Sequence, residues 1–213
     1  MSTIPMEATK SMTGTVHTVI VSKADMMRYY DPERIQGYCR TCEKYGQFWS
    51  CPPFENSPLE QLPPWTHAIL VTQKTWVEPG STKEHLIEQF LAARQILVNT
   101  LKHWERDGCL SVIAGHCSGC SKCTRPRGIA CQVPSKMRYS LEALGFDVTA
   151  LAEKLAGQSL HWPKSGVPDY LLTVGALLCR DQALALAWKQ NESAMQTAPI
   201  HPQHHPITIQ RRI

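Results

Sequence analysis

Residues 110–131 read LSVIAGHCSGCSKCTRPRGIAC, and this stretch decides what kind of domain the chain forms. Its beginning, Leu110 to Ala114, is rich in apolar and β-branched residues and predicts a buried strand. The strand leads directly into cysteines spaced C-x2-C-x2-C-x7-C, with small residues between the first three. We therefore expect a sheet whose strand ends carry loops that gather thiols around a metal.

The spacing of these cysteines, Cys117, Cys120, Cys123 and Cys131, favours an iron–sulfur cluster. A [4Fe–4S] cubane presents its irons at separate corners, so a single tight turn can supply three thiolates while a fourth comes from farther along the chain. The first three positions match the bacterial ferredoxin run, although the last cysteine comes later than in that run. Zinc more often takes its thiolates as two separated pairs, and it remains the alternative metal.

The residues around these thiols are basic. From Cys109 to Leu141 the sequence contains no Asp or Glu. It does contain the cations Lys122, Arg125, Arg127, Lys136 and Arg138. Nearby cations offset the negative charge of a thiolate-bound cluster, and an exposed basic surface suits an acidic partner protein.

Another thiol window, CRTCEKYGQFWSCPP, spans residues 39–53; because it comes earlier in the chain we call it the first window, and residues 117–131 the second window. Cys39, Cys42 and Cys51 are predicted to bind a second metal centre, because a C-x2-C pair with a third cysteine nearby suits metal ligation. Only three cysteines are local, so a cubane bound here would leave one iron open to water, substrate or a small ligand unless another group closes it.

The remaining candidates for that fourth position are few. Cys109 and Cys179 are spare thiols, but both are expected at apolar strand ends, where a buried structural cysteine is the ordinary explanation. His116 could be a ligand or a hydrogen-bond donor to one. In the C-terminal tail, His201, His204 and His205 could trap a divalent metal weakly.

The hydrophobic pattern predicts alternating strands and helices. Strands are expected at 16–22, 67–76, 110–114 and 170–178. Helices are expected within 23–37 and at 81–107, 140–144, 148–156 and 181–190. In the first, Asp31 and Pro32 would be the N-cap and the first helical residue. In the longest, 81–107, Ser81 and Glu84 would form a capping box. The predicted fold class is α/β, with α+β as the alternative: a single domain with a mixed sheet, flanking helices and metal-binding cysteine loops. It occupies residues 14–190, between a flexible tail over 1–13 and a disordered tail over 191–213.

Composition limits the function classes. The chain has 213 residues, 43% of them hydrophobic, and a formal charge of +4, which is too mild to indicate nucleic acid as a partner. The longest nearly apolar stretch, Tyr170 to Cys179, is too short for a membrane span, which needs about 20 residues. The N-terminus lacks the apolar region of a secretory signal, so we expect a cytoplasmic protein. In that reducing compartment, nine cysteines favour metal ligation over a disulfide framework.

Together the two windows resemble a known family. The pattern CRTC-x2-YG-x2-W-x-CPP from Cys39, and AG-x-C-x2-C-x2-C-x7-C-x2-P from Ala114, are similar to those of an uncharacterised prokaryotic family of predicted metal-binding proteins, DUF2284. The resemblance extends roughly from Tyr29 to Leu178. It implies that the cysteines of both windows are metal ligands, and it implies no particular reaction.

The sequence therefore supports one leading hypothesis and two alternatives. The leading one is an iron–sulfur protein with one or two [4Fe–4S] clusters that transfers electrons to, or supports the redox chemistry of, a partner enzyme in anaerobic metabolism. In the first alternative, a cluster with an open iron acts catalytically on a small ligand. In the second alternative, the metal is zinc, which either holds loops in place for partner binding or is transferred to a client protein.

Overall fold

The computed structural model describes residues 14–105, 108–160 and 166–196, and its centre is a four-stranded sheet. The strands lie in the order β1 (Gly14–Ser22), β2 (His67–Trp76), β4 (Tyr170–Cys179) and β3 (Cys109–Ile113). A single domain that combines a sheet with helices is confirmed. The sheet is not mixed, however: every neighbouring pair is antiparallel, because β4 inserts between β2 and β3 and runs opposite to both.

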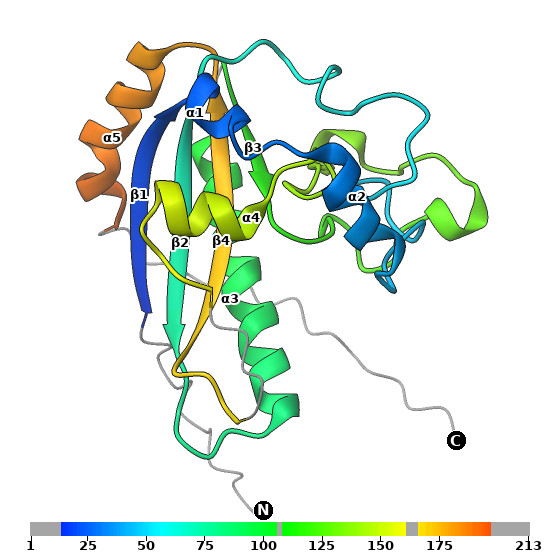
Figure 1. Ribbon diagram of the computed structural model, residues 1–213, viewed down its shortest axis with the longest axis horizontal. Helices are drawn as coiled ribbons and strands as arrows, with labels where there is room; N and C mark the ends of the chain where they lie inside the picture. The colour runs from blue at the N-terminus through cyan, green and yellow to red at the C-terminus, as the bar shows by residue number, and fades with distance from the viewer. Residues whose placement is uncertain (1–13, 106–107, 161–165, 197–213) are drawn as a thin grey trace, which may run out of the picture.

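Helices cover both faces of the sheet (Figure 1). On one face lie α1 (Lys23–Met27), α4 (Val148–Ala150) and the π-helix η3 (Leu151–Leu155); on the other lie α3 (Lys83–Trp104) and α5 (Gln182–Gln196). Successive residues of a strand point to opposite faces. In β2, Leu70 accordingly packs with the first set of helices and Ile69 with the second. Covering both faces explains why the central strands β2 and β4 are buried along most of their length.

The helix starts follow from local capping. The helix α2 (Pro32–Arg40) begins as predicted, with the Asp31 side chain accepting a hydrogen bond from the Arg34 amide at 3.1 Å and proline at the first position. The long helix α3 begins one residue later than a cap at Ser81 would place it. Its cap is Thr82, whose hydroxyl accepts from the His85 amide at 3.2 Å, while Ser81 bonds the Glu78 carbonyl instead.

Other expectations differ in detail. Residues 141–145 form turns instead of a helix, and the segment after them is α4 continued by the π-helix. The helix α5 extends past residue 190 to Gln196. The predicted N-terminal tail, the C-terminal tail from residue 197 and its histidines lie outside the described residues. In the described part of the chain, no helix is long and apolar enough to cross a membrane.

Both thiol windows lie beyond the β3 edge of the sheet (Figure 1). We call this part of the molecule the cysteine lobe; it consists of residues 32–64 and 114–139. Apart from α2, its regular structure is limited to two short 3-10 helices, η1 (Arg125–Arg127) and η2 (Pro134–Lys136). The lobe is therefore held by side-chain contacts more than by backbone ladders.

Candidate metal centre

The two thiol windows, far apart in the sequence, pack directly against each other. The fully buried Ser50 hydroxyl accepts a hydrogen bond from the Cys117 amide at 2.8 Å. The indole of Trp49 donates to the carbonyl of Ile129 at 3.1 Å, and the rings of Phe48 and His116 lie 4.3 Å apart between centroids. The fold thus joins the two predicted centres into one site region.

Arg125, from the second window, holds the loop of the first. Its guanidinium donates to the carbonyl of Phe48 at 2.7 Å and also to the carbonyls of Cys51 and Pro53. It lies over the ring of Trp49, 5.2 Å from the centroid. The planar fork of arginine can serve several acceptors at once, so one side chain fixes the backbone around Cys51.

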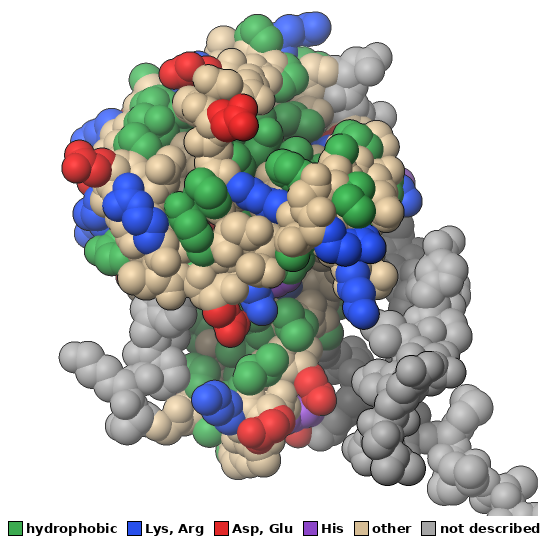
Figure 2. All heavy atoms as spheres, turned by 90° about the vertical axis from the view of Figure 1, so that its right-hand side faces the viewer, with side chains coloured by type: hydrophobic (Ala, Val, Ile, Leu, Met, Phe, Trp, Pro, Cys, Tyr) green, Lys and Arg blue, Asp and Glu red, His purple; other side chains and the backbone are tan. Residues whose placement is uncertain are grey.

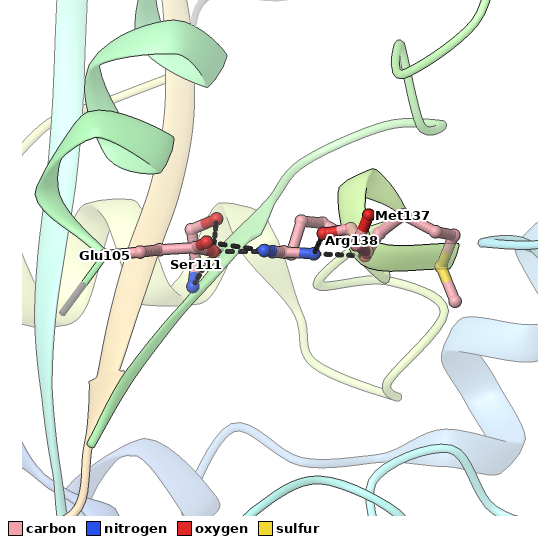
Figure 3. Close-up of polar contacts among 5 residues, drawn as sticks. Glu105, Ser111, Met137 and Arg138 are labelled. Carbon is pink, nitrogen blue, oxygen red and sulfur yellow. Dashed lines mark hydrogen bonds and ion pairs between the residues drawn. The ribbon is translucent and has the colours of Figure 1, made fainter. Parts of the chain in front are cut away.

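A second arginine ties the end of the second window to the sheet (Figure 3). Arg138 forms an ion pair with Glu105, which follows α3, and also donates to the carbonyls of Ser135 and Met137. The Glu105 carboxylate accepts further hydrogen bonds from the amide and hydroxyl of Ser111 in β3. Both charged side chains are largely buried, at 17% and 18% exposed, so the pair has little solvent screening.

This pair gives a pH-dependent prediction. Although burial alone would raise the pKa of Glu105, hydrogen bonds from Arg138 and Ser111 outweigh it and hold the pKa below its usual 4.5. The ionised carboxylate therefore stabilises the fold above about pH 5, and this contribution is lost as the pH falls through the lowered pKa. We expect Glu105→Gln to lower the free energy of unfolding by about 3 kcal/mol near neutral pH.

Urea unfolding at several pH values measures this effect, with Glu88→Gln as the control because Glu88 is exposed on α3, the helix that Glu105 follows. The difference in the free energy of unfolding between the wild type and Glu105→Gln should decrease below pH 4.5. The prediction would be contradicted if this difference were the same at every pH. It would also be contradicted if Glu105→Gln lost no more unfolding free energy than Glu88→Gln does.

The three thiols of the first window lie near one another. Cys39 is in the last turns of α2, Cys42 is exposed beyond its end, and Cys51 is buried. Burial, followed by the negative charges of Glu142, Cys51 and Cys42, raises the pKa of Cys39 to about 11. Burial also raises the pKa of Cys51, partly opposed by a hydrogen bond with Ser50. Buried thiols that lie close to one another stay protonated unless a metal ion displaces the protons.

The thiols of the second window also interact with one another. Cys120 is exposed, and the others are half-buried. Burial raises the pKa of Cys120, and the neighbouring Cys131, Cys117 and Cys123 raise it further in that order. Cys117 and Cys131 are thus on the same side of the molecule, both near Cys120. Soft thiolate donors gathered in this way suit iron–sulfur clusters or zinc, so the donor set fits the expected group.

The thiols are gathered but not arranged around a common point. Among the described residues, no three side chains of His, Cys, Asp or Glu form a group that could hold a metal ion as they stand. The assignment of Cys39, Cys42, Cys51, Cys117, Cys120, Cys123 and Cys131 as ligands remains a prediction. To bind a metal, the cysteine side chains in the loops of the cysteine lobe would have to shift.

The two spare cysteines are not available as ligands. Cys109 and Cys179 face each other across β3 and β4, with their Cα atoms 4.2 Å apart, and form a disulfide. The flanking Arg180 amide bonds the Gly108 carbonyl, which makes the cysteines the closely spaced, non-hydrogen-bonded pair of the ladder. The sequence predicts these two as buried structural cysteines at strand ends and favours metal ligation over disulfides; the strand register instead places them in contact as a pair.

Sequence reasoning missed several residues that build this region. Ser50 and Arg125 look like ordinary loop residues, and only the docking of the windows reveals their roles. Arg94 did carry a signal: it stands four residues after Phe90 and three before Leu97, on the apolar stripe of a helix. It is 5% exposed and donates to the carbonyls of Ala114 and His116. The His116 ring packs on Phe48, and burial lowers its pKa.

A comparison with known families agrees with the location of the thiols. The family model described as "Predicted metal-binding protein (DUF2284)" matches residues 27–179, which include both windows and every cysteine of the chain. No curated protein and no solved structure matches the chain. Metal binding is thus supported at the level of the family, and the kind of metal is not specified.

Proposed function

The chain belongs to DUF2284, a family of predicted metal-binding proteins, and we propose that it is a cytoplasmic iron–sulfur protein that supplies electrons to a partner enzyme, in anaerobic metabolism. Cys117, Cys120, Cys123 and Cys131 would hold a [4Fe–4S] cluster. The remaining window thiols, Cys39, Cys42 and Cys51, would hold a second centre. A cluster bound in this way exchanges single electrons.

One observation carries the proposal: the nine cysteines of the chain divide into a set of four, a set of three and a disulfide pair. The sets of four and three consist of free thiols and lie in one lobe, whereas the pair lies in the sheet. Four thiolates complete a cubane, and the run of three at x2 intervals suits iron–sulfur better than the paired knuckles of zinc.

The surface of the lobe supports a partner of opposite charge. Arg125 and Arg138 are engaged inside the protein, so they do not contribute to it. Lys122, Arg127 and Lys136 remain exposed. Figure 2 faces this side of the molecule and shows Lys and Arg side chains spread over the lobe among hydrophobic ones. A redox protein with an acidic docking surface would be attracted to it at low salt.

The position of Cys109 and Cys179 in the sheet also favours catalysis at an open iron as a second candidate function. Because Cys109 and Cys179 face each other in the sheet, outside the cysteine lobe, no further cysteine of the lobe remains to complete the set of three. A cubane held by Cys39, Cys42 and Cys51 alone would leave one iron free for a small ligand. Electron paramagnetic resonance with and without candidate ligands tests this function, and a spectrum that never changes would count against it.

Metal and sulfide analysis of anaerobically purified protein tests the main proposal. We expect a brown protein that absorbs at roughly 400 nm and contains about four irons and four sulfides per chain for one cluster, or nearly twice that for two. A colourless protein with stoichiometric zinc would refute the iron–sulfur assignment and favour a zinc protein that holds loops for a partner or transfers metal.

A further inference from the structure

Arg94 is a cation buried at the base of the cysteine lobe. It belongs to α3, with 5% of its surface exposed, and donates from Nε to the Ala114 carbonyl at 2.9 Å and from Nη2 to the His116 carbonyl. Both acceptors are neutral. Of the ion pairs within 4.0 Å in the described part of the chain, none includes Arg94. A guanidinium buried in this way is costly unless other negative charge lies near it.

The groups near Arg94 that can carry negative charge are a carboxylate, Glu142, and one thiol from each window. Burial lowers the pKa of the Arg94 guanidinium, and Glu142, Cys117 and Cys51 oppose this lowering, in that order. Two of the three are predicted ligands, one from each set. Thiols carry negative charge in their metal-bound form, so metal loading would add negative charge near Arg94 beyond that of Glu142.

The hydrogen bonds show why one side chain can serve both sets. His116, whose carbonyl accepts from Arg94, directly precedes Cys117. The amide of Cys117 in turn bonds Ser50, and Ser50 directly precedes Cys51. Arg94 therefore lies where the backbones of the two windows meet.

The backbone beside Arg94 leaves no room for a side chain. Gly115 has φ +81°, a conformation that favours glycine, and a Cβ there would lie 3.2 Å from Nε of Arg94. Its amide donates to the Glu142 carboxylate at 3.1 Å. The guanidinium and this carboxylate thus lie on either side of the turn that opens the second window.

We propose that Arg94 is the shared counter-cation of the two centres, stabilising their loaded, anionic form and raising the reduction potential of both. The inference rests on the proposed function, since it requires metal-bound thiolates in both windows. Reduction adds negative charge to a cluster, and a fixed buried cation favours that added charge more than an exposed one does. Arg94 is a positioning residue in this role and is not itself a ligand.

Two variants separate charge from hydrogen bonding. Arg94→Gln removes the charge and keeps a donor for a carbonyl, whereas Arg94→Lys keeps the charge and loses the planar fork. Redox titration followed by electron paramagnetic resonance measures the potential of each centre, and metal analysis measures loading. Lys83→Gln is the control, because Lys83 is an exposed cation of α3, the helix that carries Arg94, and solvent screens its charge.

We expect Arg94→Gln to lower the ratio of reduced to oxidised cluster at least tenfold at a fixed applied potential, which is about 59 mV for a one-electron couple. Arg94→Lys should stay within threefold of the wild type, as should Lys83→Gln. Equal shifts in Arg94→Gln and Arg94→Lys, or no shift in either, would overturn the proposal. If Arg94→Gln does not fold, the potentials of Arg94→Lys decide: wild-type values support the role of charge and shifted values overturn it.

The metal content of the wild type keeps this result separate from the proposed function. If the wild type contains zinc, the iron–sulfur function fails, but the counter-cation can still be tested by the rate at which a chelator removes the zinc. Arg94→Gln should then lose zinc at least tenfold faster than Arg94→Lys, and equal rates would overturn the proposal.

Discussion

Replacing Cys120 with serine is expected to remove the second-window centre, lowering the iron content by about four atoms per chain. Cys120 lies within the run of three, near each of the other thiols of its set. Its side chain is exposed, so the substitution should leave the fold intact. Iron and sulfide analysis of anaerobically purified protein measures the loss, and circular dichroism checks the fold.

Two control variants are compared with Cys120→Ser. Ser121→Ala changes the exposed residue beside Cys120 and should keep the wild-type iron content. Cys179→Ser breaks the disulfide with Cys109 and should lower stability under oxidising conditions, by up to about 4 kcal/mol for a loop of this length, while iron per chain stays unchanged. Wild-type iron in Cys120→Ser, or a loss of iron in Cys179→Ser, would show that the ligand set is wrong.

Replacing Arg125 with lysine is expected to lower the free energy of unfolding by about 3 kcal/mol and to weaken metal binding in the first window. Lysine keeps the charge but lacks the fork that reaches the carbonyls of Phe48, Cys51 and Pro53 together. Carbonyls that lose their donor in a half-buried site raise the energy of the folded loop. Urea unfolding and iron content after brief exposure to a chelator measure the two effects.

Arg127→Lys is the matched control for this prediction. Arg127 lies in the same 3-10 helix, η1, and its side chain is exposed. It should behave as the wild type in both measurements. If Arg125→Lys and Arg127→Lys gave the same unfolding curve and the same retention of iron, the contact between the windows would not stabilise the first centre.

The strands were predictable because their signal is local. The apolar and β-branched runs at 16–22, 67–76 and 170–178 lie within strands of the sheet, and the run at 110–114 differs from β3 by one residue at each end. Their pairing was not predictable in the same way. Whether two strands run parallel or antiparallel depends on where the chain enters the sheet, and β4 enters between β2 and β3 with the opposite direction. The expected mixed sheet was wrong for this reason.

Cysteine spacing likewise identified both thiol windows and the family to which the chain belongs. Spacing is a property of the sequence, and the reach of a thiol from a short loop depends mainly on it. The contact between the windows is different. Ser50 meets Cys117, and Arg125 meets Cys51, only because the chain between them returns through β2, α3 and β3.

By itself, the sequence determined the strands, the start of α2 and the two sets of cysteines, since each depends on residues a few positions apart. The tertiary structure alone decided the antiparallel sheet, the pairing of Cys109 with Cys179 and the burial of Arg94 between the windows. Each of these joins segments far apart in the chain, and the register and packing that bring such segments into contact are properties of the whole fold.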